Sequence, residues 1–255
     1  MKVELNIPEG LHEITLEQYQ QYIELTEKLQ DNPEGLKQAA ISCFCRVPMS
    51  TVRFIRAVDV DAIYNQFIEY FKQKPPMQPI IKIGDEVFGF EPDLQNMDYG
   101  AYLDLDSNIT TWANYHKALA VMYRPIVKNK GNKYQIQQYE GTANYSEVMK
   151  HVTLDVVFGA NVFFLSFRKR LTERFDGLFT QADENERVSD FSEEGQFAQR
   201  WGWYQTIYIL AKGDVTKFDQ VTREPLFKCL TLLMFEKEKE DIEYRRLQRQ
   251  MNKGG

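Results

Sequence analysis

The chain has few cysteines for its length, and their number and spacing exclude one class of fold. Its 255 residues include three cysteines, Cys43, Cys45 and Cys229. An odd number, with two of them separated by a single residue, does not form a disulfide framework. We therefore predict a reducing, cytosol-like compartment in which the thiols are not oxidised.

The sequence also lacks the hydrophobic runs that secretory leaders and membrane spans need. The first ten residues, MKVELNIPEG, have no apolar stretch typical of a signal peptide. The most apolar window, 154–167, is too short to span a bilayer and is interrupted by Asp155, Asn161 and Ser166. We interpret this window as a buried helix and expect no membrane contact.

Common catalytic motifs are missing as well. The sequence has no Gly-x-Ser-x-Gly, no His-Glu-x-x-His and no phosphate-binding Walker loop. Its histidines, His12, His116 and His151, are far apart and have no second ligand at metal-binding spacing. A zinc site built from Cys43, Cys45 and a distant histidine is an alternative, but a cysteine pair in an apolar helix is more typical of core packing. We predict a protein that is not an enzyme and has no cofactor.

What the chain does have is the composition of a folded protein. Hydrophobic residues make up 43% of it and aromatic residues 13%, which argues against a disordered chain. A chain of this length can bury a core without the help of disulfides or metals. Its net charge of −6 favours solubility and disfavours broad, non-specific binding to nucleic acid or anionic membranes.

Apolar residues recur at helical spacing along most of the sequence. Thr15 and Gln18 fit a capping box that begins an amphipathic helix, and Pro33 suits the first position of the next helix. The acid-rich stretch 93–108 is predicted as turns. The same spacing predicts further helices at about 59–73, from 108 or 111 to just before Pro125, and at 145–151, 154–179, 197–211 and 224–250.

Two segments, near 80–91 and 125–138, predict small β-hairpins, because β-branched and aromatic residues flank a glycine-containing turn in each. The second turn is flanked by Lys128, Lys130 and Lys133, which suggests a phosphate-binding loop. Lysines at a hairpin tip also keep edge strands from pairing, and a phosphate cradle would lead into a helix. The predicted fold class is mainly α, a multi-helix globular protein with two small β-hairpins and a long, charged C-terminal helix.

The polar and acidic stretch 181–196 is the best candidate for a loop or a linker. It would separate a helical core with both hairpins, residues 1–180, from a C-terminal helical region, residues 197–255. The chain length by itself is compatible with one large domain or with two small ones.

A basic cluster, Arg168 to Arg170 together with Arg174, is the first candidate for partner binding. Cations are favourable in the C-terminal half of a helix, so a solvated helix face explains the cluster. A patch facing nucleic acid or an acidic partner is the alternative.

A second candidate is the aromatic helix that contains Trp201, Trp203 and Tyr204. Such residues usually pack in a core, but exposed next to Arg200 they would make a protein–protein hot spot. A third candidate is the end of the C-terminal helix, whose opposite charges can pair four residues apart. The candidate partner-binding residues are Arg168, Arg170, Trp201, Trp203, Tyr204, Tyr244, Arg245 and Arg249.

Three blocks of the sequence carry a resemblance. They are FGFEPDLQNMDYGAYLDLDS at 88–107, HKALAVMYRPIVKNKGNKYQIQQYEG at 116–141, and the helix-and-charged-tail segment at 209–246. They resemble a family of tailed-bacteriophage proteins that are encoded among tail and virion-morphogenesis genes.

The resemblance implies an assembly chaperone or a minor structural protein of the tail or baseplate, and brings no catalytic residues. Its partners would be other phage tail or virion proteins, or further copies of itself, with the C-terminal helix docking into a groove or pairing with another helix. It would act in the host cytoplasm during assembly, or remain in the virion, in the tail or the capsid interior. The alternative is a virion cargo protein or a nucleic-acid-binding protein that uses the basic cluster at 168–174.

Overall fold

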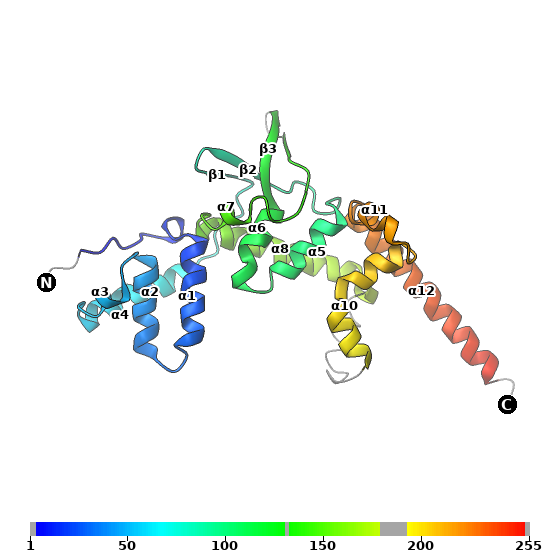
Figure 1. Cartoon of the computed structure of the whole chain (residues 1–255), viewed down its shortest axis with the longest axis horizontal. Coiled ribbons are helices and arrows are strands. Elements are labelled where there is room, and N and C mark those ends of the chain that lie inside the picture. Colours follow the sequence, from blue (N-terminus) through cyan, green and yellow to red (C-terminus); the bar gives the residue numbers. More distant parts are fainter. Residues whose placement is uncertain (1–3, 131–132, 179–192, 253–255) are drawn as a thin grey trace. The chain divides into compact units, whose positions relative to one another are not determined.

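A computed structural model describes residues 4–130, 133–178 and 193–252, with side chains from residue 200 onward in the last range (Figure 1). The fold is mainly α, as the sequence predicts, with a small antiparallel sheet and a long C-terminal helix. The chain divides into two compact units. Unit 1 comprises Met1–Pro92 and Asp104–Phe164, and unit 2 comprises Asp93–Leu103 and Leu165–Gly255.

Two of the three boundaries between the units fall inside helices, α5 (Tyr99–Asn108) and α8 (Leu154–Arg174), and the third lies between Pro92 and Asp93. The predicted linker at 181–196 lies outside the described residues, except that 193–196 begin a helix. Its role as a linker therefore stays a prediction.

Unit 1 begins with helices whose ends follow their sequence signals. Thr15 and Gln18 form the predicted capping box, in which the Thr15 N–H donates to Gln18 Oε1 at 3.0 Å. Pro33 occupies the first turn of the next helix, and Asn32 Oδ1 caps it by accepting from the Gly35 N–H at 2.9 Å. These helices are α1 (Leu16–Lys28), α2 (Pro33–Phe44), α3 (Met49–Val52) and α4 (Ala57–Phe71).

Gln18 joins the first two helices. Its buried amide nitrogen donates to the carbonyl oxygens of Cys43 at 2.9 Å and Phe44 at 3.2 Å, at the end of α2. Because carbonyls in the last turn of a helix have no partner within it, this contact satisfies two of them. Phe44 then packs edge-on against Phe67 of α4, with 5.2 Å between ring centroids.

The two predicted hairpins are present, and they join into one sheet. The strands are β1 (Ile80–Ile83), β2 (Glu86–Phe90), β3 (Tyr123–Lys130) and β4 (Lys133–Ile136), ordered β1-β2-β3-β4 and antiparallel throughout. The central pairing places Phe88 opposite Pro125 and Phe90 opposite Tyr123. Gly84 supplies the positive φ, 60°, that the first turn requires.

A buried ion pair fixes the join between the hairpins. Arg124 of β3 pairs with Glu91 just after β2, and both side chains are at most 10% exposed. The guanidinium also lies over the ring of Tyr139, whose hydroxyl donates to Asp104 Oδ2 at 2.5 Å. Arg124 is therefore a structural residue of unit 1.

Unit 1 is completed by α6 (Tyr115–Met122), α7 (Ser146–Met149) and the first part of α8. The segment before α1 is tied to the start of α8, because the Leu16 N–H donates to the Val152 carbonyl and the Leu154 N–H to the Ile14 carbonyl, both at 2.8 Å. The window 154–167 is helical as predicted and buried along one side. It is not buried all round, since Val162 and Leu165 are each 46% exposed.

Unit 2 is built from the start of α5, the end of α8, α10 (Glu193–Leu210), α11 (Phe218–Thr222) and α12 (Leu226–Met251). Tyr99 of α5 donates through its hydroxyl to Thr206 Oγ1 at 2.6 Å and through its N–H to the Glu224 carbonyl at 2.9 Å. The turns that we expected at 93–108 are present only before Tyr99, and the helix α5 replaces them from there to Asn108. Its buried residues Tyr99, Tyr102 and Leu105 stabilise it despite a polar, glycine-containing sequence.

We predict that Gly159→Ala destabilises unit 1 by about 1–3 kcal/mol. A Cβ at this position of α8 would lie 2.5 Å from the carbonyl oxygen of Pro76, a backbone atom that cannot move aside cheaply. The measurement is denaturant unfolding followed by far-ultraviolet circular dichroism. Asn161→Ala, two residues further along the same helix, is the control, and an unchanged midpoint for the glycine variant would contradict the packing.

Candidate functional site

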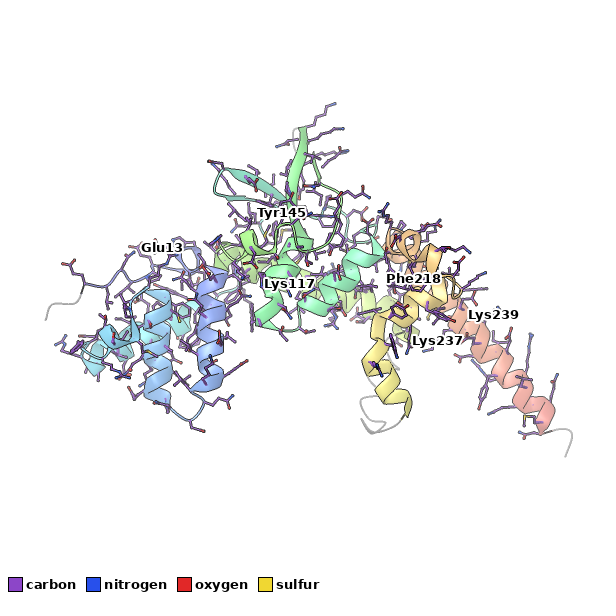
Figure 2. The ribbon with its side chains drawn as sticks, viewed as in Figure 1. Glu13, Lys117, Tyr145, Phe218, Lys237 and Lys239 are labelled. Carbon is purple, nitrogen blue, oxygen red and sulfur yellow. The ribbon has the colours of Figure 1, made fainter. Side chains whose placement is uncertain are left out.

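Exposed aromatic side chains gather on α10 in unit 2. Trp201, Tyr204 and Tyr208 are 40%, 48% and 54% exposed, and we call them the α10 patch. The rings of Trp201 and Tyr204 lie 5.5 Å apart, and the guanidinium of Arg200 lies 5.5 Å from the Trp201 ring centroid. Tyr204 also packs edge-on against Phe218 of α11, the residue labelled in Figure 2. The patch combines the residue types that dominate binding energy at protein interfaces.

Trp203 does not belong to this patch. It is half-buried, and its ring packs edge-on against Tyr102 at 5.9 Å. Between the two tryptophans, Gly202 has non-helical backbone angles, φ 32° and ψ −119°, which kink α10. The structure thus brings two of the three predicted aromatic residues together on the surface and packs the third within unit 2. Tyr208, which also belongs to this aromatic helix, follows Tyr204 by about one helical turn and is exposed as well.

The basic cluster on α8 does not form one surface. Successive residues of an α-helix are about 100° apart, so Arg168 and Arg170 point in nearly opposite directions. Arg174 stacks on the ring of Phe227, 4.9 Å from its centroid, and Lys169 lies 3.9 Å from the carboxylate of Glu173. These positive charges are dispersed and partly paired, so the geometry gives little support to a nucleic-acid interface.

The helix α12 has two parts with different surroundings. Its first part packs within unit 2, where Lys237 donates through Nζ to the carbonyl of Gly177. Every residue of 238–251 is exposed, and we call this segment the distal part of α12. It begins directly after Lys237 and includes Lys239 (Figure 2). Tyr244 is 62% exposed, and Arg245 and Arg249 are exposed with it.

One face of α12 runs through both parts. The buried side chains Leu226, Leu230 and Leu233 recur at spacings of three and four residues. The same progression passes through Lys237 and Glu240 and then reaches Tyr244, Leu247 and Met251, of which the last two are 58% and 76% exposed. Two charged residues thus separate the buried apolar part of this face from its exposed apolar part.

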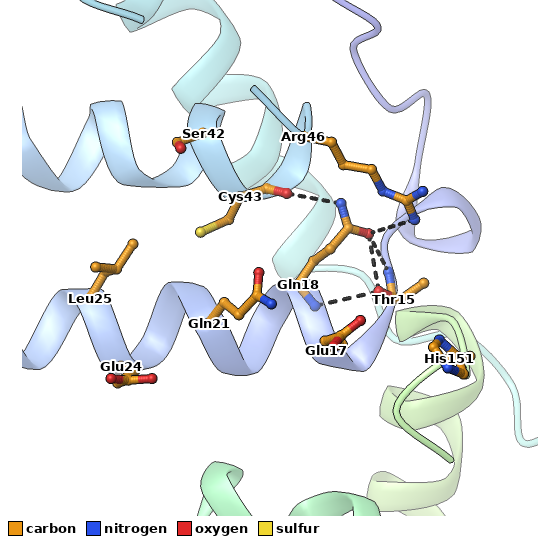
Figure 3. Close-up of a pocket in the computed structure, with 10 residues that line it drawn as sticks. All are labelled: Thr15, Glu17, Gln18, Gln21, Glu24, Leu25, Ser42, Cys43, Arg46 and His151. Atoms are coloured by element: carbon orange, nitrogen blue, oxygen red, sulfur yellow. Dashed lines mark hydrogen bonds between the residues drawn. The ribbon is translucent and has the colours of Figure 1, made fainter. Parts of the chain in front are cut away.

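Sequence analysis did not find a groove between α1 and α2 in unit 1 (Figure 3). Its volume is about 690 Å³. Charges of both signs border it, from Glu17, Glu24 and Arg46, and His151 lies at one end. Arg46 has a positive φ of 55° and reaches Gln18 Oε1 with Nη2 at 3.5 Å. The strained backbone and the mixed charges do not define one ligand class.

The cysteine in this groove is not an activated nucleophile. Burial raises the pKa of the Cys43 thiol to about 11, and it raises the pKa of Cys45 equally and that of Cys229 to about 12. A thiol with such a pKa stays protonated near neutral pH, and the thiolate is the reactive form. Within the described ranges, no three His, Cys, Asp or Glu side chains lie together as a metal site would need.

In the described part of the chain, no helix combines the length and the apolar character that crossing a membrane requires. Comparison with protein-family models, with curated proteins and with solved structures finds no match for this chain. The resemblance to a phage morphogenesis family therefore stays a prediction.

We predict that the three thiols of the folded protein react with iodoacetamide at pH 8 at least about 100-fold more slowly than those of the unfolded chain. The reason is the difference between a raised pKa and the ordinary value near 8.5, which lowers the thiolate fraction by that factor. Mass spectrometry of timed samples, with and without guanidinium, measures both rates. Rapid alkylation of any one thiol in the folded protein would contradict its burial.

We predict opposite outcomes for the two tryptophans of α10. Trp203→Ala removes a packed ring and should lower the free energy of unfolding by about 2–3 kcal/mol. Trp201→Ala removes an exposed ring and should cost less than about 1 kcal/mol. Denaturant unfolding of the two variants side by side tests the assignment. Equal losses would mean that Trp201 is part of the core.

Proposed function

We propose that the protein acts by binding other proteins during the assembly of a tailed bacteriophage, as an assembly chaperone or as a structural subunit of the tail or virion. The observation that carries the proposal is the α10 patch. The virion context comes from the resemblance of 88–107 and 116–141 to phage morphogenesis proteins.

The composition of the patch supports a binding role. Large rings bury much apolar area with few rotatable bonds, and Arg200 can add a directed contact at the edge. Trp201 contacts Tyr204, and Tyr204 contacts Phe218, so the positions of both rings are partly fixed before any partner arrives. A preformed patch loses less conformational entropy on binding than mobile side chains would.

A phage with the gene deleted tests the role. We expect deletion to abolish infectious particles and the wild-type gene, supplied from a plasmid, to restore them. The double variant Trp201→Ala with Tyr204→Ala should restore at least tenfold fewer infectious particles, because it removes the centre of the patch. Phe54→Ala, which removes a 67% exposed ring from unit 1, is the matched control and should restore them fully. Normal yields from the deletion, or full restoration by the double variant, would contradict the proposal.

The two forms of the proposed role, structural subunit and assembly chaperone, predict different protein compositions of the finished particle. A structural subunit stays in the virion at a fixed copy number, whereas an assembly chaperone leaves before the particle is complete. Mass spectrometry of purified virions separates them, because recovery at a stoichiometric copy number excludes a pure chaperone.

A further inference from the structure

The edge of the sheet at β1 is open. Strand β1 pairs with β2 on one side, and within the described part of the chain no strand pairs with its other side. The Phe90 N–H donates to the Pro79 carbonyl at 2.8 Å, so the next position of β1 that bonds to β2 is Ile81. The N–H and C=O groups of Ile80 and Lys82 therefore point away from β2, and no hydrogen bond among the described residues uses them. These four backbone groups can bond to another strand.

A pocket lies along this open edge. Its volume is about 210 Å³, and its lining consists of residues 81–84, 151–153 and Val156. Consecutive residues of a strand point to opposite faces, and no residue of β2 lines the pocket, so the pocket follows the free edge of β1. Ile81, Val152 and Val156 are buried and give it an apolar floor. A strand added at this edge can place an aliphatic side chain in the pocket.

The segment 4–8 has the pattern of such a strand. It belongs to no helix or strand (Figure 1), and no hydrogen bond among the described residues involves its backbone. Leu5 and Ile7 alternate with Glu4 and Asn6, and this alternation is typical of a strand with one apolar face. The chain thus carries both an open strand edge and a strand-like segment that is not paired.

We propose that residues 4–7 of one copy of this chain add to β1 of a second copy as an antiparallel strand. In this pairing Glu4 lies opposite Lys82 of the second copy, and Asn6 lies opposite Ile80. All four outward backbone groups of β1 are then hydrogen-bonded. Opposite charges that face each other across two strands are favourable, so the pair of Glu4 and Lys82 adds to the backbone bonds.

Pattern and charge select this register. Leu5 lies beside Ile81, on the buried face of the sheet, and reaches the pocket. A shift by one residue would turn Leu5 to the exposed face and Glu4 toward the apolar floor. A shift by two residues, or a parallel strand that keeps Leu5 beside Ile81, would separate Glu4 from Lys82. A lysine on an edge strand hinders pairing with other strands, and an acidic residue opposite it removes that hindrance.

A second copy is the occupant because both surfaces are open at once within one chain. The Leu154 N–H donates to the Ile14 carbonyl at 2.8 Å, which holds the start of the chain at α8, and residues 4–8 make none of the bonds to β1. Another copy pairs the segment and the edge without changing any helix or strand. Four residues of added strand bury a small area, so we expect a dissociation constant on the order of 10 µM.

This pairing goes beyond the proposed function and does not depend on it. It uses β1 and the segment 4–7 and not the α10 patch, and it can be measured with the pure protein. The phage complementation experiment and the association measurement can therefore fail independently of each other.

Sedimentation velocity of the full chain between about 1 and 200 µM tests the pairing, because this range brackets the expected dissociation constant. We expect reversible self-association. Lys82→Pro removes an N–H that β2 does not use, and it should raise the dissociation constant about tenfold or more. Lys82→Ala keeps this N–H and is the matched control, with an increase of no more than about fivefold. A wild-type protein that stays monomeric at every concentration would overturn the proposal, as would equal association of the two variants.

Charge reversal tests the register. Glu4→Lys and Lys82→Glu each set like charges opposite one another, and each should weaken self-association. An equimolar mixture of the two variants should associate as well as the wild type, because every segment 4–7 then meets a β1 of opposite charge in the other variant. Circular dichroism should confirm that both variants keep the wild-type secondary structure. A mixture that associates no better than either variant alone would contradict the pairing of Glu4 with Lys82.

Cysteine cross-linking tests the occupant. Glu4→Cys combined with Lys82→Cys should form a disulfide between copies, because directly opposite residues have Cα atoms about 5.5 Å apart. The native cysteines are buried. Glu4→Cys combined with Val87→Cys is the matched control and should not cross-link, because Val87 is exposed but lies one strand further away. A disulfide within a single chain would overturn the proposal and show that the chain's own segment covers β1. Equal cross-linking of the control would overturn it as well.

Discussion

The packing of one helical face of α12 is the constraint on which unit 2 depends. Leu226, Leu230 and Leu233 bury the first part of this face, and their periodicity orients the helix. Lys237 and Glu240 interrupt this face where the packing ends, and Tyr244 and Leu247 beyond them are exposed. The same helix is thus a core element in its first part and a surface element in its distal part.

Much of the fold could be predicted because its signals are local. The capping box of Thr15 and Gln18 and the first-turn position of Pro33 depend on neighbouring residues, and both are present in the structure. The same holds for the hairpin turn at Gly84 and for the long C-terminal helix. The joining of the hairpins into one sheet could not be predicted, because the pairing of Phe88 with Pro125 connects distant segments of the chain.

Some of the features that sequence analysis missed depend on tertiary packing, and others on helical geometry. The helix α5 has a glycine and several short polar side chains, which favour turns in isolation, yet buried Tyr99 and Tyr102 stabilise it. Trp201 and Trp203 are two residues apart, a spacing that already places side chains on different sides of a helix, and the kink at Gly202 lies between them. Arg168 and Arg170 point in different directions because of helical geometry alone, and counting the basic residues in this segment does not show that. The groove beside Arg46 arises only when α1 and α2 pack together.

Hydrogen exchange along α12 tests the central claim, that its first part is a core element of unit 2 and its distal part has no packing within the chain. In the dilute protein, amides in 240–251 should exchange at least about 100-fold faster than those in 230–236, because no tertiary packing protects them. Strong protection of 240–251 in the dilute monomer would contradict the account, because the distal part would then be stable without any partner.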